Sequence, residues 1–176
     1  MRRPVAAVGT AVFFVLAPCV VSGLVPWLLT GWHLPRPLSG LALAQVIAGG
    51  LIVIAAAVVV IRNFVRFVAE GRGTPAPIAA PERLVVGGDY RYVRNPMYVA
   101  VVAAVLGQAL IFASLGLLLY AAAIWLAMAT FVRLYEEPTL QDRFGAGYET
   151  YRRNVRAWLP RLHPWQGENE DVSSRR

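Results

Sequence analysis

Apolar positions in this 176-residue chain form long unbroken runs, unlike the short amphipathic stretches of a soluble core. The first run spans residues 5–29 and the second spans residues 41–61, and neither contains a charged residue. Each run is long enough to cross a hydrocarbon core of about 30 Å as a helix. The pattern therefore predicts two N-terminal transmembrane helices within residues 1–61. Gly49 and Gly50 would allow a neighbouring helix to pack closely against the second one.

A third run, residues 97–132, is also free of charge. As a single straight helix it would be roughly 54 Å long, far more than a bilayer core needs. We therefore predict two short spans that turn between Ser114 and Gly116. The fold class that follows is all-α: an integral membrane protein with about four transmembrane helices.

The remaining segments are polar. Residues 62–95 carry six arginines, and the turn-forming glycines and prolines within this segment make it too polar to span a membrane. Beyond Arg133 we expect an amphipathic helix at about residues 139–155, because Leu140, Phe144, Tyr148 and Tyr151 recur there at helical spacing. Residues 62–166 would form the functional core, and residues 167–176 a disordered tail.

Arginine placement predicts the topology. Arginines precede the first run, fill the segment between the second and third runs, and follow the fourth span, whereas Arg36 alone lies in the turns of the opposite side. Both termini and the middle segment should therefore face the cytoplasm, in the inner or plasma membrane. The net charge of +7 fits cytoplasmic loops and anionic headgroups, so we expect no nucleic-acid partner.

Cys19 raises the alternative of a lipoprotein signal, since arginines and an apolar stretch precede it. Pro18 directly before the cysteine fits such a cleavage site poorly, and the apolar run continues to Leu29. We therefore expect that residues 5–29 form a transmembrane helix and are not removed as a signal.

Two polar features are candidates for chemistry. One is the segment 84–98, in which Gly87 and Gly88 precede a cluster of tyrosines and arginines and Pro96 opens the third span. The other is Glu136 with Glu137, directly after the fourth span. A capped helix start with interfacial tyrosines and snorkelling arginines would explain the first feature, and an interfacial ion pair would explain the second.

The predicted hairpin nevertheless joins the two features. The third span begins on the side where the fourth span ends, so Arg94, Asn95 and Pro96 should lie at the depth of Glu136 and Glu137. Carboxylates and guanidinium groups that converge in this way can frame a polar ligand. We expect no metal site.

At these residues the sequence resembles the isoprenylcysteine carboxyl methyltransferase family and its phospholipid methyltransferase relatives. The family pattern is Leu-Val-x-x-Gly-x-Tyr-x-x-x-Arg-His-Pro-x-Tyr, then Glu-Glu after a helical hairpin, then Phe-Gly-x-x-Tyr-x-x-Tyr and a proline. The corresponding residues here are Leu84, Val85, Gly88, Tyr90, Arg94, Asn95, Pro96, Tyr98, Glu136, Glu137, Phe144, Gly145, Tyr148, Tyr151 and Pro160.

The resemblance implies a methyltransferase that uses S-adenosylmethionine on a lipophilic acceptor in the membrane, such as an isoprenylcysteine-type carboxylate. It implies a cytoplasmic cofactor site formed by the middle loop, the ends of the last two spans and the amphipathic helix. Arg94, Arg133 and Glu137 would act on the reacting groups, with Arg133 facing the substrate. The residues implied to bind the cofactor are Leu84, Val85, Tyr90, Asn95, Pro96, Met97, Tyr98 and Glu136.

Asn95 departs from the family pattern, which has histidine at this position. An asparagine still donates and accepts hydrogen bonds but does not titrate near neutral pH, so a proton-carrying role is in doubt here. Two other interpretations stay open: a membrane sterol or enone reductase that uses NADPH, which shares a related Arg-His-Pro-x-Tyr ending, and a non-enzymatic accessory protein.

Overall fold

The computed structural model describes residues 18–34, 40–70 and 84–167, and within these ranges every regular element is helical. The predicted all-α class is confirmed for this part of the chain. The N-terminal part of the first predicted span and nearly all of the predicted tail lie outside the described residues. The helices are α2 (Val25–Thr30), α3 (Gly40–Glu70), α4 (Pro96–Ile111), α5 (Leu115–Phe131), α6 (Glu137–Phe144) and α7 (Ala146–Asn154), joined by the π-helical turns η1 (Val20–Leu24) and η3 (Val132–Glu136) and the 3-10 turn η2 (Gly88–Arg91).

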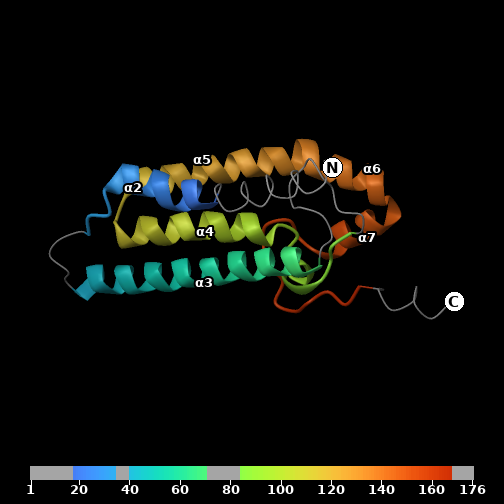
Figure 1. Ribbon diagram of the computed structural model, residues 1–176, viewed down its shortest axis with the longest axis horizontal. Coiled ribbons are helices and arrows are strands. Elements are labelled where there is room, and N and C mark those ends of the chain that lie inside the picture. The colour runs from blue at the N-terminus through green and yellow to red at the C-terminus, as the bar shows by residue number, and fades with distance from the viewer. Residues whose placement is uncertain (1–17, 35–39, 71–83, 168–176) are drawn as a thin grey trace, which may run out of the picture.

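The three longest helices lie side by side, with α4 between α3 and α5 (Figure 1). The shorter α2 lies near α5 at one end of this bundle, and α6 and α7 lie at the other end. The described charged segments on either side of the α4–α5 hairpin, residues 84–95 and 132–154, therefore lie at the same end of the apolar bundle.

Two glycines set the spacing between α3 and α4. A side chain at Gly107 would stand 2.8 Å from the backbone oxygen of Gly49 and 2.9 Å from a methyl carbon of Val53. The two backbones therefore touch, which larger residues at either glycine would prevent. The predicted close packing at Gly49 is confirmed.

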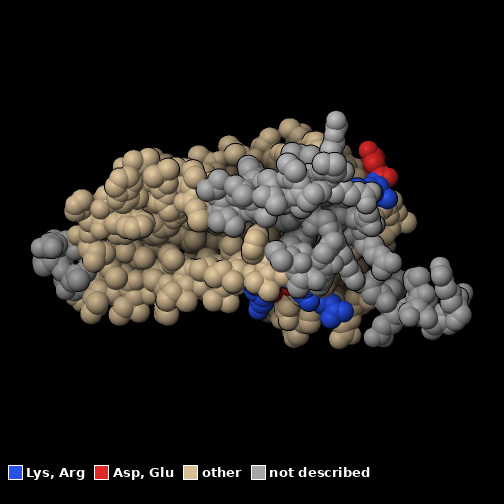
Figure 2. All heavy atoms as spheres, in the orientation of Figure 1, with Lys and Arg blue, Asp and Glu red and all other residues tan. Residues whose placement is uncertain are grey.

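Within the described residues, two stretches of helix are long and apolar enough to cross a membrane, Gly40–Arg66 and Leu115–Phe144. Two further apolar stretches, Val20–Thr30 and Pro96–Ile111, are shorter. On the face that Figure 2 shows, the end of the molecule that holds α2 and the start of α3 displays no charged side chain among the described residues. The charged groups in view lie toward the end that holds α6 and α7.

The helices differ from the predicted segments at two points and turn as predicted at a third. The helix that holds the second apolar run continues past Ile61, because α3 reaches Glu70 and the polar groups of Arg62 and Asn63 bond to Asp89 of η2. The amphipathic helix is divided into α6 and α7 at Gly145, whose φ of +51° no helix interior accommodates. The hairpin between α4 and α5 turns where expected, with Ser114 capping α5 through a 3.3 Å hydrogen bond from the Leu117 amide.

The segment of η1 and α2 is held against the bundle by two backbone carbonyl groups, which Pro26 leaves without a helical donor. Pro26 has no N–H to donate to the preceding turn, and the helix widens into the π-turn η1 just before it. The carbonyl oxygens of Val21 and Ser22 accept hydrogen bonds from Tyr120 (3.1 Å) and Gln108 (2.7 Å). The apolar interior thus keeps two polar side chains because they satisfy backbone groups that lack helical partners.

Replacing Gln108 by leucine should therefore destabilise the fold by about 1 kcal/mol, because the Ser22 carbonyl loses its donor. Thermal unfolding in detergent micelles measures this loss. In a Pro26→Ala background, the alanine restores a backbone N–H that can donate to the Ser22 carbonyl. Gln108→Leu should then lower the free energy of unfolding by less than it does in the wild type. An equal cost in both backgrounds would show that the proline is not the reason for the bond.

Candidate functional site

The start of α4, the turn η3 and the helices α6 and α7 meet at the polar end of the bundle, together with residues 84–95 (Figure 1). A direct contact joins the two polar features of the sequence. The Tyr98 hydroxyl on α4 donates a 2.7 Å hydrogen bond to Oε1 of Glu136 at the end of η3. The two ends of the helical hairpin therefore lie at the same level.

Glu137 lies in a cluster of charged and aromatic side chains. Its Oε1 is 3.0 Å from a guanidinium nitrogen of Arg94, and its Oε2 is 4.0 Å from Arg152. Arg94 also donates a 3.0 Å hydrogen bond to the Tyr148 hydroxyl. The side chains of Arg94 and Glu137 are only 11% and 13% exposed, so each supplies the counter-charge that the other needs.

Asn95 connects the start of α4 to the segment after α7. Its side-chain amide donates a 3.2 Å hydrogen bond to the carbonyl of Ala157, and the backbone N–H of Arg94 donates to the carbonyl of Arg156 at 2.9 Å. In this position asparagine acts as a hydrogen-bond donor, which requires no titration.

Two tyrosines of α7 form a floor beneath residues 84–90. Tyr148 and Tyr151 of α7 are buried with Val155, and Leu84 and Tyr90 pack against them. The Tyr151 hydroxyl donates a 2.7 Å hydrogen bond to the carbonyl of Tyr90. Residues 84–90 are therefore held on α7 both by packing against the tyrosine rings and by the hydrogen bond to the Tyr90 carbonyl.

Burial raises the pKa of Tyr90, and the nearby charges of Glu136 and Asp89 raise it further. Burial likewise raises the pKa of Tyr151. For Tyr148, burial also dominates and raises the pKa, although Arg94 opposes this effect. All three hydroxyl groups remain protonated at neutral pH; that of Tyr151 donates to the Tyr90 carbonyl, and that of Tyr148 accepts from Arg94.

The other predicted site residues are spread around this junction. Val85 and Met97 are partly buried, Pro96 is buried at the first position of α4, and Arg133 in η3 is exposed. Proline is suited to that first helical position because its missing N–H would have no helical partner there.

Sequence reasoning missed the contribution of α3. Arg62 and Asn63 reach Asp89 in the turn η2, so an otherwise apolar helix contacts the candidate site. The available signal was a polar Arg-Asn pair that continues the helical register of the second run. Tyr148 and Tyr151 of α7 were identified from the apolar stripe and from the family pattern, but not as the residues that bond Arg94 and the Tyr90 carbonyl.

The sequence pattern of the phospholipid methyltransferase family matches residues 43–147, which is more than half of the chain. The matched region begins in α3 and ends at the second residue of α7, and it includes Arg94, Tyr98 and Glu136. No curated protein and no solved structure matches the chain.

Replacing Glu137 by glutamine should leave the buried guanidinium of Arg94 without its counter-charge and destabilise the fold by about 3 kcal/mol. Glu149→Gln is the matched control, because Glu149 pairs with Arg153 where the side chains are 37% and 76% exposed. Thermal unfolding in micelles should separate the two variants clearly. Equal melting temperatures for both would contradict the structural role assigned to Glu137.

Proposed function

Since the chain belongs to the phospholipid methyltransferase family, we propose that it transfers a methyl group from S-adenosylmethionine to a lipophilic acceptor in the membrane. The observation that carries this proposal is the hydrogen bond between Tyr98 and Glu136. It joins the two parts of the sequence pattern across neighbouring helices, at the end of the bundle where the polar residues gather. The cofactor is polar and the acceptor is apolar, so a site at such a boundary is accessible to both.

The side chains at this end suit the amino-acid portion of S-adenosylmethionine. A zwitterion needs a donor for its carboxylate and an acceptor for its ammonium group. Within the described part of the chain, Nε of Arg94 is a buried donor and Oε1 of Gln141 is a buried acceptor, and neither has a hydrogen-bond partner. Glu136 uses Oε1 for Tyr98, and its Oε2 would be the acceptor for a cationic or hydroxyl group of the ligand.

The bound cofactor supplies a methyl group activated by the positive sulfonium. The work of the protein is then positioning and the exclusion of water, because a thiolate or carboxylate acceptor needs no base. Tyr90 and Tyr98 would line the cofactor site together with Leu84, Val85, Pro96 and Met97. Asn95 would keep the start of α4 on the C-terminal segment, a role for which asparagine replaces histidine adequately.

The substrate side would face the membrane. We propose four spans with both termini on the cytoplasmic side, as the arginine distribution indicates. Exposed Arg133 would hold an anionic group of the acceptor at the interface, and the acyl or prenyl part would remain among the apolar helices. Arg94 and Glu137 would act together, as an ion pair that fixes the walls of the site.

Ligand-binding measurements distinguish S-adenosylmethionine from NADPH as the cofactor. Isothermal titration of the purified protein should give a saturable signal with S-adenosylhomocysteine, the product form of the cofactor, and none with NADPH. Binding of NADPH instead would favour a reductase. Binding of neither ligand would favour an accessory role.

Glu136→Gln should weaken S-adenosylhomocysteine binding about tenfold, because it removes a charged acceptor next to Tyr98. Glu149→Gln again serves as the control, since it removes the same charge from the exposed side of α7. An unchanged affinity in the Glu136 variant would contradict its assignment to the cofactor.

A further inference from the structure

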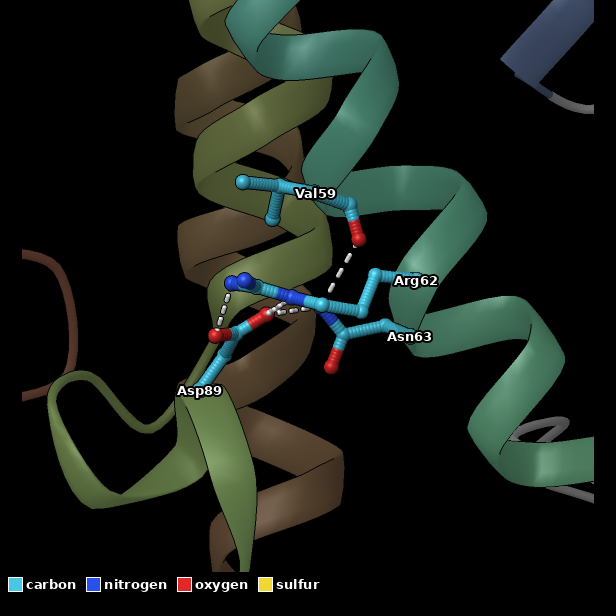
Figure 3. Close-up of polar contacts among 4 residues, drawn as sticks. All are labelled: Val59, Arg62, Asn63 and Asp89. Atoms are coloured by element: carbon cyan, nitrogen blue, oxygen red, sulfur yellow. Dashed lines mark hydrogen bonds and ion pairs between the residues drawn. The ribbon is translucent and has the colours of Figure 1, made fainter.

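A cluster of three polar side chains holds the loop of the candidate site against α3. Nε of Arg62 donates a 3.0 Å hydrogen bond to Oδ2 of Asp89, and a second guanidinium nitrogen of Arg62 pairs with Oδ1. The Asn63 amide donates to the same Oδ2 at 2.7 Å. Figure 3 shows both α3 side chains directed at Asp89, which lies in the turn η2. We refer to Arg62, Asn63 and Asp89 as the Asp89 cluster.

The burial of this cluster differs between its members. Asn63 is 1% exposed, and its amide is shared between Asp89 and the carbonyl of Val59 at 2.8 Å. The Asp89 side chain is 17% exposed, whereas that of Arg62 is 61% exposed. The Asn63 bond therefore forms away from solvent, while water and salt screen the contact with Arg62.

Backbone geometry brings the turn close to α3 at the same point. Gly88 has a φ of +60°, a conformation that glycine adopts without strain. A side chain there would also collide with the guanidinium group of Arg66. Glycine at this position thus allows the turn to rest directly on α3, and Asp89 then holds it there.

The opposite side of the same turn is held by the C-terminal part of the chain. The Tyr90 carbonyl accepts from Tyr151, and the carbonyls of Arg91 and Tyr92 accept from the backbone amides of Trp165 and Arg161, each at 2.9 Å. Tyr90 follows Asp89 directly, so the carboxylate on one side and Tyr151 on the other determine where the Tyr90 ring lies.

From this arrangement we propose that Asp89 is a positioning residue, which places Tyr90 and the cofactor loop by anchoring them to Arg62 and Asn63 of α3. The inference rests on the proposed function, because it concerns the same cofactor site. Asp89 occupies a position that the family pattern leaves open, between its glycine and its tyrosine. The helix α3, which supplies none of the motif residues that imply the cofactor site, would thereby take part in placing the cofactor loop.

The test is Asp89→Asn, which preserves the size of the side chain but replaces one carboxylate oxygen by a donor facing two donors. S-adenosylhomocysteine should bind about tenfold more weakly to this variant by isothermal titration. Arg62→Gln, which removes only the exposed partner, should show a smaller change in the same direction. Asp142→Asn, an exposed acidic residue of α6, is the control for charge alone and should bind as the wild type does.

Hydrogen exchange gives a readout that does not depend on the ligand. The amides of Tyr92 and Val93 donate to the Asp89 carbonyl at 3.0 and 3.2 Å, so their exchange reports whether the turn stays formed. In Asp89→Asn their exchange should accelerate, while the melting temperature stays near that of the wild type.

Two results would overturn the proposal. Unchanged exchange in Asp89→Asn and Arg62→Gln would show that the cluster does not hold the turn. Faster exchange with unchanged ligand affinity would show that the turn does not position the cofactor. A wild-type protein that binds no S-adenosylhomocysteine would instead refute the proposed function, and the exchange data would still decide whether Asp89 anchors the loop.

Discussion

A polar group inside a hydrocarbon layer must find its partner within the protein, and this constraint explains most of the structure. Charged residues are absent from α4 and α5, and the polar side chains Gln108 and Tyr120 are retained where they satisfy the carbonyls near Pro26. The described charged residues lie in the last turns of α3 and in the segments before α4 and after α5. The hairpin of α4 and α5 then brings the latter two segments together, so the same constraint that builds the bundle also concentrates carboxylates, guanidinium groups and tyrosines in one place.

The candidate site depends on hydrogen bonds between segments far apart in the sequence. The start of α4 is tied to the end of η3 by Tyr98 and Glu136, and to the segment after α7 by the Asn95 amide. The buried pair of Arg94 and Glu137 lies between these ties. Removing Glu137 leaves the buried guanidinium group of Arg94 without its counter-charge. Replacing Glu137 is therefore expected mainly to lower the stability of the fold, whereas replacing Glu136 is expected mainly to weaken the proposed binding of the cofactor.

Much of the helical bundle was predictable from the sequence because apolar runs and their lengths depend only on local composition. The turn of the hairpin, the close packing at Gly49 and the meeting of the Glu136 region with the start of α4 all follow from such local patterns. The continuation of α3 beyond Ile61 was not predicted, because the buried amide of Asn63 finds an acceptor in Asp89, 26 residues later in the sequence. The break at Gly145, where φ is +51°, was not predicted either, whereas the buried pair of Arg94 and Glu137 agrees with the convergence that the hairpin predicts. The family match supports a methyltransferase, while the cofactor and catalytic roles of single residues come from the resemblance and stay proposals.

The central claim is that methyl transfer takes place at the junction of Tyr98 and Glu136, with an acceptor drawn from the membrane. The most direct measurement is transfer of a radiolabelled methyl group from S-adenosylmethionine to a membrane lipid extract by the purified protein, compared with its Tyr98→Phe variant. The account predicts label in the organic phase with the wild-type protein and markedly less with the variant, at equal thermal stability. Label confined to the aqueous phase, or equal labelling by both proteins, would contradict it.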